Sequence, residues 1–195
     1  SSPGQPSRAM AAKLFKGALT SDGLPHSEMA ACLAAGEHPN LIRVAGPLAE
    51  QADAPAGLLL ELIEPSYQVL AGPPSLASCT RDQYPSERRF SLSEALHIAR
   101  GAAAAMSHLH AKGILHGDLY GHNLLVNPDG DCLLSDFGAA SFFAPDSALG
   151  AALQRIEARA FGCLLEELLQ RCTAEELEPL WQLQRRCVST NLDER

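Results

Sequence analysis

The sequence predicts an α+β protein with two unequal lobes, in which a few strands and one helix precede a mainly helical part. Three observations support this fold class. Residues 57–63 form a compact apolar run that is typical of a buried strand. Residues 91–94, Ser-Leu-Ser-Glu, form a capping box that opens a long helix, and residues 149–170 have the pattern of a second one. The 195 residues are enough for one domain or for two closely coupled lobes.

The first lobe is expected to contain short elements around a single helix. Residues 9–16 predict a short strand, and a weaker strand signal lies near 41–48. Between them, Pro25 is a residue typical of a first helical turn, so we expect a helix over roughly 25–35 that ends at Gly36.

The second lobe is expected to begin with a long connection and to continue with a long helix. Residues 64–90 are rich in proline and predict this connection, with one short helix near 75–80. The helix that starts after Ser91 is expected to end at Gly113. The core-facing side of this helix is predicted to carry Leu92, Leu96, Ala99, Ala103, Met106 and Leu109 (or His110).

A hairpin and a last helix complete the second lobe. The apolar runs 124–126 and 132–134 flank the turn sequence Asn-Pro-Asp-Gly at 127–130, which predicts two paired strands. A further capping box at 173–176 predicts a final helix that reaches about residue 188.

Composition and charge exclude several classes of partner. The chain has 15 basic and 23 acidic residues, a formal net charge of −8, whereas nucleic acids and anionic membrane surfaces attract basic proteins. No apolar stretch reaches the roughly 18 residues of a membrane span, and the first residues lack a signal-peptide pattern. The six cysteines are far apart and form no C-x-x-C pair. We therefore expect free thiols in a reducing cytoplasm, with neither nucleic acid nor membrane as partner.

Two polar clusters interrupt the apolar pattern on either side of the predicted hairpin. The first, at 116–123, contains Asp118 and Asn123, and the second, at 135–138, contains Asp136. Because a tight hairpin returns the chain on itself, Asn123 and Asp136 are expected to lie close together. Their oxygen atoms suit a hard cation such as Mg²⁺. Asp118 lies one short loop away, where it could orient an attacking hydroxyl or receive its proton.

These clusters resemble motifs of the protein kinase family. The pattern H-x-D-L-x-x-x-x-N followed by D-F-G is similar to the family's catalytic loop and metal-binding motif. Lys13, after Ala12, resembles the lysine of the third strand, and Glu28 fits its partner on the following helix. The resemblance implies that Lys13 holds the α- and β-phosphates of the nucleotide and that Glu28 orients Lys13. It also implies that Asp118 is catalytic and that Asn123 and Asp136 bind magnesium.

Other segments follow the family's order along the chain. His38-Pro39-Asn40 resembles the bend after that helix, and residues 161–168 resemble the central helix of the large lobe. Residues 61–63 look like the hinge that binds adenine through its backbone. In that reading Leu60, Glu61 and Ile63 contact the nucleotide base.

The resemblance implies a bilobal protein-kinase-like fold that uses ATP and Mg²⁺. Residues 1–63 would form a partial first lobe, and residues 64–195 a mainly helical second lobe with a reduced activation segment. Only twelve residues precede Lys13, so the family's first two strands and glycine-rich loop are expected to be absent. The arrangement most resembles compact bacterial kinase domains, some of which are attached to leucine-rich repeats that would lie outside this chain.

Three further departures from the family pattern affect the expected function. Gly117 replaces the arginine that pairs with a phosphorylated activation loop, so we expect no control of that kind. Tyr120 stands where Ser/Thr kinases place a lysine near the transferred phosphate. Only 20 residues separate Asp136 from Glu157, which stands where the family has the aspartate of its central helix.

The function that the resemblance implies is transfer of the γ-phosphate of ATP to a protein hydroxyl, of Ser or Thr rather than Tyr. Two alternatives stay open. The chain could be a pseudokinase, a scaffold module that binds nucleotide without turnover. It could also be a small-molecule kinase of the aminoglycoside or choline type, because those enzymes share the pattern H-G-D-L-x-x-x-x-N.

Overall fold

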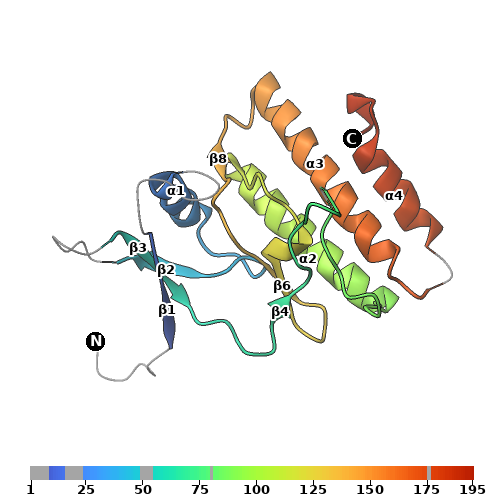
Figure 1. Ribbon diagram of the computed structural model, residues 1–195. Coiled ribbons are helices and arrows are strands. Elements are labelled where there is room, and N and C mark those ends of the chain that lie inside the picture. The colour runs from blue at the N-terminus through green and yellow to red at the C-terminus, as the bar shows by residue number, and fades with distance from the viewer. Residues whose placement is uncertain (1–8, 16–23, 49–54, 80, 175–176) are drawn as a thin grey trace.

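The computed structural model describes residues 9–15, 24–48, 55–79, 81–174 and 177–195 of the chain. It confirms the predicted α+β class. A small sheet with one helix forms the first part, and a mainly helical part follows (Figure 1).

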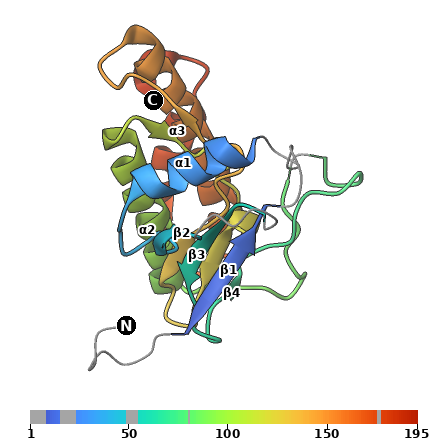
Figure 2. The same cartoon turned by 90° about the vertical axis from the view of Figure 1, so that its left-hand side faces the viewer.

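The first part is a three-stranded antiparallel sheet with the strand order β1-β3-β2. Its elements are the strands β1 (Met10–Leu14), β2 (Val44–Pro47) and β3 (Gly57–Glu61), and the helix α1 (Pro25–Ala35). The central strand β3 is the first part of the predicted apolar run, and its buried Leu58 belongs to the hydrophobic core. Figure 2 shows α1 lying over one side of this sheet.

The helix α1 has the ends that the sequence predicts. Pro25 occupies its first turn, where the missing N–H of proline leaves no hydrogen bond unmade. Gly36 follows the last helical residue with a φ of 64°, a left-handed conformation that glycine adopts without steric cost.

The segment after α1 attaches the first part to the second. The N–H of Leu134 donates to the carbonyl of Asn40 (2.8 Å), and the N–H of Ile42 donates to the carbonyl of Leu134 (3.3 Å). The side-chain amide of Asn40 also donates to the carbonyl of Cys132 (3.0 Å). Residues 40–42 are therefore hydrogen-bonded to the second strand of the predicted hairpin and lie beside it.

The second part contains three long or medium helices, five short strands and two single-turn 3-10 helices among the described residues. They are β4 (Gln68–Val69), α2 (Leu92–Ala111), β5 (Ile114–Leu115), a 3-10 helix (Gly121–Asn123), β6 (Leu124–Val126), β7 (Cys132–Leu134), β8 (Ser141–Phe142), α3 (Ala148–Leu169), α4 (Glu178–Val188) and a second 3-10 helix (Leu192–Glu194). The strands β4, β6 and β7 form one sheet, and β5 pairs with β8. Only residues 143–147 lie between β8 and α3, so the segment after the second polar cluster is short.

The long helix α2 begins as predicted but turns a slightly different face to the core. The Ser91 hydroxyl accepts a hydrogen bond from the N–H of Glu94 (3.1 Å), as a capping box requires. Leu92, Leu96, Ala103 and Met106 of the predicted face are only partly buried. The buried residues of the helix are Ala95, Ile98, Ala99, Gly101, Ala102, Ala105 and Leu109. The small residues lie inside because β7 and α3 pack closely against α2.

Two local predictions in the second part are wrong or incomplete. Residues 76–79 form turns where a helix was expected near 75–80, of which residue 80 lies outside the described residues. The strands β4, β5 and β8 were not predicted, because two-residue strands carry no periodic signal.

Of the capping box at 173–176, residues 175–176 lie outside the described part, and α4 itself begins at Glu178.

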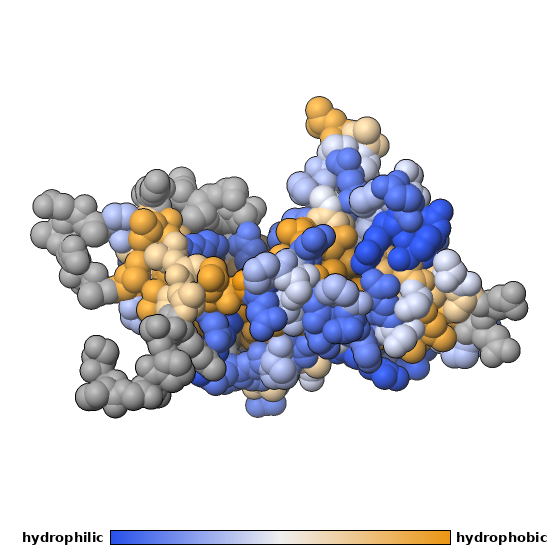
Figure 3. All heavy atoms as spheres, turned by 90° about the horizontal axis from the view of Figure 1, so that it is seen from below, coloured by the Kyte–Doolittle hydropathy of each residue, from blue (hydrophilic) through white to orange (hydrophobic). Residues whose placement is uncertain are grey.

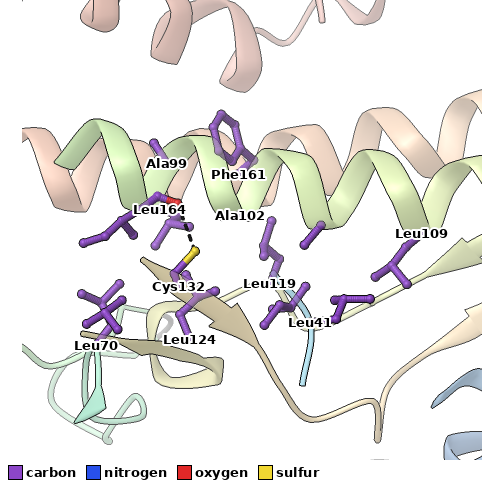
Figure 4. Packing of buried hydrophobic residues seen from close by; sticks show 14 of the residues in the cluster. Leu41, Leu70, Ala99, Ala102, Leu109, Leu119, Leu124, Cys132, Phe161 and Leu164 are labelled. Atoms are coloured by element: carbon purple, nitrogen blue, oxygen red, sulfur yellow. Dashed lines mark hydrogen bonds between the residues drawn. The ribbon is translucent and has the colours of Figure 1, made fainter. Parts of the chain in front are cut away.

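One hydrophobic core connects the two parts. It runs from Ala31 of α1 and Leu58 of β3, through Leu41 in the connecting bend, to the helices α2 and α3. Figure 4 shows Leu41, Leu109 and Leu119 gathered on the strand side of α2. The core thus fixes the bend at 38–40 and the hairpin relative to each other.

The surface carries hydrophilic areas with apolar ones between them (Figure 3). Exposed large apolar side chains include Leu14 of β1, and Leu149 and Ile156 of α3. Among the described residues, no helix combines the length and the hydrophobicity needed to cross a membrane. All six cysteines are free, as predicted, although only Cys32 and Cys132 are fully buried.

Candidate functional site

Lys13 of β1 lies between two acidic side chains that come from distant parts of the chain. Its ammonium forms an ion pair and hydrogen bond with Glu28 of α1, whose side chain is only 3% exposed. The same ammonium lies 3.6 Å from Oδ1 of Asp136. Lys13 therefore joins the first part of the molecule to the second polar cluster.

The surroundings of Lys13 favour its charged form. Partial burial opposes the charge, but the hydrogen bond to Glu28 and the negative charge of Asp136 outweigh burial and raise the Lys13 pKa above its ordinary value of 10.5. Next to this pair, burial and the charge of Glu28 raise the pKa of the Cys32 thiol to about 12. The site therefore holds one fixed cation and a neutral thiol at neutral pH.

Asp136 follows β7 in a conformation that few residues adopt. Its φ of 54° lies in the left-handed region, which costs a non-glycine residue free energy that the surrounding structure must offset. The N–H of Gly138 donates to Oδ1 of Asp136 (3.2 Å) and helps to hold the carboxylate. The side chain is 47% exposed, so it is accessible to a ligand.

The hairpin brings Asn123 beside the second cluster, as the sequence predicts. Leu124 pairs with Leu134 in the register of β6 and β7, and the N–H of Ser135 donates to the carbonyl of Asn123 (2.9 Å). Asp136 therefore directly follows Ser135, the residue that is hydrogen-bonded to Asn123.

Asn123 also holds Asp118. The buried amide Nδ2 of Asn123 donates to the backbone carbonyl of Asp118 (2.9 Å) and to Oδ2 of its carboxylate (2.8 Å). The carboxylate itself is about one-third exposed. One oxygen of Asp118 is thus fixed from inside the protein, while the group stays accessible from outside.

His116 is fully buried and holds the loop at 116–123 against the second polar cluster. Its Nε2 bonds to the carbonyl of Ser135 (2.8 Å), and its ring packs edge-on against Phe137 at 5.2 Å between centroids. Burial lowers the pKa of His116 against the opposing hydrogen bond to Ser135, so its neutral form is favoured. His116 thereby connects the first polar cluster to the second.

Gly117 and Glu157 form another support of the same loop. The N–H of Gly117 donates to Oε1 of the buried Glu157 (2.8 Å), and His110 Nε2 contacts Oε2 of Glu157 at 2.5 Å. Burial would raise the Glu157 pKa, but the hydrogen bonds from His110 and Gly117 outweigh it, so the pKa is lowered. A carboxylate at 157 therefore anchors the loop to α3.

The conformation of Gly117 excludes a side chain. Its φ is +81°, and an added Cβ would lie 2.4 Å from the carbonyl oxygen of Ala139. The arginine that the family resemblance places here would need a different backbone path. The neighbouring Tyr120 keeps a neutral hydroxyl, because burial and the charge of Asp118 raise its pKa.

The predicted nucleotide contacts of the first part and Asp136 line two different hollows, and neither hollow is lined by Asp118 or Asn123. Lys13, Glu28, Leu60 and Asp136 line one small cavity of about 40 Å³. The backbone at the end of β3 leads away from this cavity. Glu61 and Ile63 line a separate groove of about 490 Å³, so the structure does not bring all the predicted nucleotide contacts together.

The backbone of the expected hinge is partly used within the protein. The N–H of Glu61 donates to the carbonyl of Arg43 (2.9 Å), and the N–H of Leu62 donates to that of Ala9 (3.3 Å). The N–H of Ile63 has no hydrogen-bond partner among the residues that the structure describes. Of the three N–H groups at 61–63, that of Ile63 is therefore the one that no described residue satisfies.

The donor set fits magnesium bound together with phosphate rather than a metal held by protein alone. Within the described segments, no group of three or more His, Cys, Asp and Glu could hold an ion. Asn123 and Asp136 offer one amide and one carboxylate, and the carboxylate of Asp136 lies 3.6 Å from the Lys13 ammonium. Mg²⁺ takes one or two protein oxygens in phosphate sites and completes its shell with phosphate oxygens and water.

Two site residues were missed by the sequence prediction. Asp82, from the connection between the lobes, is buried, and it binds both the backbone N–H (3.0 Å) and the ring Nδ1 (2.8 Å) of His122. The ring Nε2 of His122 lies 3.7 Å from Oδ2 of Asp118. Nothing in residues 64–90 singles out Asp82, whereas His122 stands inside the first polar cluster and was available as a signal.

Comparison with known proteins gives a family match over most of the chain. The family model for the protein kinase domain matches residues 6–159. A probable serine/threonine-protein kinase of Arabidopsis thaliana is 26% identical over 174 residues, which cover 75% of this chain and 28% of the relative.

Two other relatives match about half of the chain. A mitogen-activated protein kinase kinase kinase of Aspergillus fumigatus is 32% identical and covers 52% of this chain and 5% of its own length. The ephrin type-B receptor 3 of Mus musculus is 30% identical, with 56% and 10% covered. The chain thus spans well under a third of the length of these curated relatives, all of which are eukaryotic.

Proposed function

Because the chain belongs to the protein kinase domain family, we propose that it transfers the γ-phosphate of ATP to a hydroxyl of a protein, on Ser or Thr rather than Tyr. The observation that carries the proposal is the position of the Lys13 ammonium, which pairs with Glu28 and lies 3.6 Å from Asp136. This is the arrangement that protein kinases need to hold nucleotide phosphates beside a metal-binding aspartate. The acceptor class is inferred from the resemblance and from the similarity to the probable serine/threonine-protein kinase of Arabidopsis thaliana.

In the proposed reaction, each residue acts through its fixed position. Lys13 binds phosphate oxygens, and Glu28 keeps its ammonium in place. Asn123 and Asp136 would hold Mg²⁺, which when bound neutralises charge on the phosphates. Asp118 accepts a hydrogen bond from the acceptor hydroxyl and so orients its oxygen toward the γ-phosphate.

Two observations support this division of roles. Asn123 fixes Oδ2 of Asp118, and the other oxygen, Oδ1, has no hydrogen-bond partner within the described part of the chain. Oδ1 is therefore the atom that we assign to the acceptor hydroxyl. Base binding is assigned to the end of β3 and the residues after it, Leu60, Glu61 and Ile63, with the N–H of Ile63, which has no partner among the described residues, as donor.

A small-molecule kinase is the second candidate, and one structural feature favours it. A cavity of about 250 Å³ lies directly beside the catalytic loop, between Leu119 and Tyr120 on one side and Arg159 and Cys163 of α3 on the other. The short segment between β8 and α3 leaves little chain for docking a peptide. A hydroxylated small molecule would fit a cavity of this size. A pseudokinase is the third reading, supported by the neutral Tyr120 at the position of the family's lysine.

The test is transfer of radiolabel from [γ-³²P]ATP with Mg²⁺ by the full chain. Mixed protein acceptors, an aminoglycoside and choline are offered in separate reactions, and Asp118→Ala is the control. The proposal predicts label on protein, lost in the variant, with phosphoserine or phosphothreonine after hydrolysis. Label on a small molecule would favour the second candidate, and no transfer despite nucleotide binding would favour the pseudokinase.

Three further expectations come from the sequence, the first from its cysteines and the other two from the resemblance, and they remain predictions. They are a cytoplasmic location, a bacterial source, and leucine-rich repeats attached outside this chain. Expression of the full protein and its fractionation with the cytoplasm or with a membrane would test the first of them.

A further inference from the structure

We propose that His122 is a positioning residue for Asp118, and that Asp82 of the connection between the lobes holds His122 in place for this task. The inference rests on the proposed function, because it assigns a role in the same site. It adds to the parts that set the geometry of the reaction one variable position of the first polar cluster, His122, and one residue outside the motifs, Asp82.

His122 is held by two hydrogen bonds to the carboxylate of Asp82. Both oxygens of the Asp82 carboxylate are used, Oδ2 by the backbone N–H of His122 (3.0 Å) and Oδ1 by its ring Nδ1 (2.8 Å). The Asp82 side chain has no exposed surface, so these contacts replace its hydration. A carboxylate bound at both oxygens fixes the position of the backbone and the rotation of the ring together.

The edge of the His122 ring opposite Asp82 lies close to the carboxylate of Asp118. With Nδ1 turned to Asp82, the opposite edge of the imidazole faces the catalytic loop, and Nε2 lies 3.7 Å from Oδ2 of Asp118. Asn123 donates to the same oxygen at 2.8 Å. Oδ2 therefore has two neighbouring side chains, and we infer that the ring edge restricts rotation of the carboxylate. Oδ1 is left for the acceptor hydroxyl.

The His122 ring is also held by packing against its neighbours. Tyr120 stacks on His122 with 5.4 Å between ring centroids and an interplanar angle of 26°. The turn between these residues lies directly on the connection, since an added Cβ at Gly121 would be 2.7 Å from the Tyr84 hydroxyl. His122 is thus held by a carboxylate, a stacked ring and a close backbone contact.

The connection is attached to α3 as well as to the catalytic loop. The Tyr84 hydroxyl bonds to Glu167 (3.2 Å), and Arg81 forms an ion pair with Glu166 (2.6 Å). Asp82 lies between these two contacts in sequence. Its carboxylate therefore has a fixed base from which to hold His122.

The test separates the two contacts of the ring by side-chain length. The amide nitrogen of His122→Asn can take the place of Nδ1 toward Asp82, but the shorter side chain does not reach Asp118. The longer amide of His122→Gln can reach the position of Nε2. We expect kcat for phosphate transfer to fall between about tenfold and about a hundredfold in His122→Asn, with little change in KM for ATP. We expect His122→Gln to recover most of the loss.

Two further variants complete the design. Asp82→Asn should lower kcat like His122→Asn, and the double variant should cost no more than the larger single change, because both act through one ring. His97→Asn serves as the matched control, since the ring of this exposed histidine has one hydrogen bond among the described residues, to the backbone carbonyl of Asp129 (2.9 Å). Unchanged kcat in His122→Asn, or equal losses in the Asn and Gln variants, would overturn the proposal.

An independent measurement keeps the inference testable if wild type transfers no phosphate. That result would count against the proposed function, and the ring ¹⁵N resonances of His122 would then be compared by NMR in wild type, Asp118→Asn and Asp82→Asn. Shifts in both variants support the contact chain from Asp82 to Asp118. An unchanged resonance in Asp118→Asn would overturn the inference.

Discussion

Lys13 is the residue on which the two parts of the candidate site depend. Its ammonium contacts Glu28 from α1 and lies within ion-pair distance of Asp136 after β7. Each of these three residues comes from a different element, and alone each would be an ordinary charged residue. Their meeting in the folded chain is what gives the sequence motifs a common location.

Replacing Lys13 with methionine removes this cation while keeping most of the side-chain volume. We expect kcat/KM for ATP-dependent transfer to fall by about a hundredfold to a thousandfold, as when one charge-stabilising donor is lost from an active site. Lys112→Met is the control, because Lys112 is exposed at the end of α2. Steady-state kinetics of both variants decide the matter, and equal activity of the two would contradict the role of Lys13.

Gly117 illustrates how a departure from the family pattern becomes a local requirement. We expect Gly117→Ala to lower the free energy of unfolding by about 1–3 kcal/mol, because φ is +81° and Cβ would lie 2.4 Å from a carbonyl oxygen. Gly46→Ala is the matched control, since φ is +148° there but nothing lies within 4 Å of the added atom.

Urea denaturation measures both glycine variants. A larger loss in the Gly117 variant than in the Gly46 variant is expected. A Gly117→Ala protein as stable as wild type would show that the loop accepts a side chain, and that the arginine of the family could have been kept.

At the scale of elements, the hairpin and the loop before it were predictable because their signals are local. The turn sequence at 127–130 fixes β6 and β7, and the register then places Asn123 beside Ser135. The helices α1, α2 and α3 were predicted from end signals and apolar periodicity. The face of α2 was misjudged, since the large residues Leu92 and Leu96 are less buried than the small residues Ala102 and Ala105.

Contacts between segments that are distant along the chain could not be predicted from the sequence. Asp82 reaches His122 across 40 positions, and Glu157 reaches Gly117 across the same separation. Glu157 was found because the family pattern marks its position. Asp82 lies in an irregular segment without periodicity or motif, so only the folded chain reveals its partner.

The contact among α2, α3 and the catalytic loop predicts how stability depends on pH. The lowered pKa of Glu157 means that its stabilising charge is present above about pH 4.5 and is lost as pH falls through the lowered value. The lowered pKa of His116 means that, below its ordinary value of 6.5, the unfolded chain binds a proton that the folded chain does not. Both groups therefore destabilise the fold as pH falls.

We expect Tm to decrease from about pH 7 to about pH 4, with the Glu157 part of the decrease confined to the acid end. Glu157→Gln removes that part and leaves the part due to His116. Calorimetric melting of both proteins across this range is the measurement. An identical slope below about pH 4.5 in the variant would contradict the assignment to Glu157.

At the scale of the whole molecule, the two parts share one hydrophobic core and a backbone link at the bend. The link joins Asn40 to Leu134 and Cys132, and the core extends from Leu58 of the small sheet to α3. A shared core predicts cooperative unfolding of the described parts as a unit.

Two probes can test this cooperativity. Trp181 of α4 is the single tryptophan and reports on the helical part, whereas far-ultraviolet circular dichroism reports on all elements. We expect the two urea transitions to coincide within experimental error. A fluorescence transition that is separate from the dichroism transition would mean that the parts unfold independently.

Lys13, Asn123 and Asp136 form the proposed nucleotide and metal site. The most direct test of this site is calorimetric titration of the full chain with ATP, with and without Mg²⁺, in wild type, Asp136→Ala and the control Asp129→Ala, whose carboxyl is exposed in the hairpin turn. We expect binding that needs Mg²⁺, is lost in Asp136→Ala and is unchanged in Asp129→Ala. Equal binding of ATP without Mg²⁺, or equal binding by Asp136→Ala, would contradict the proposed site.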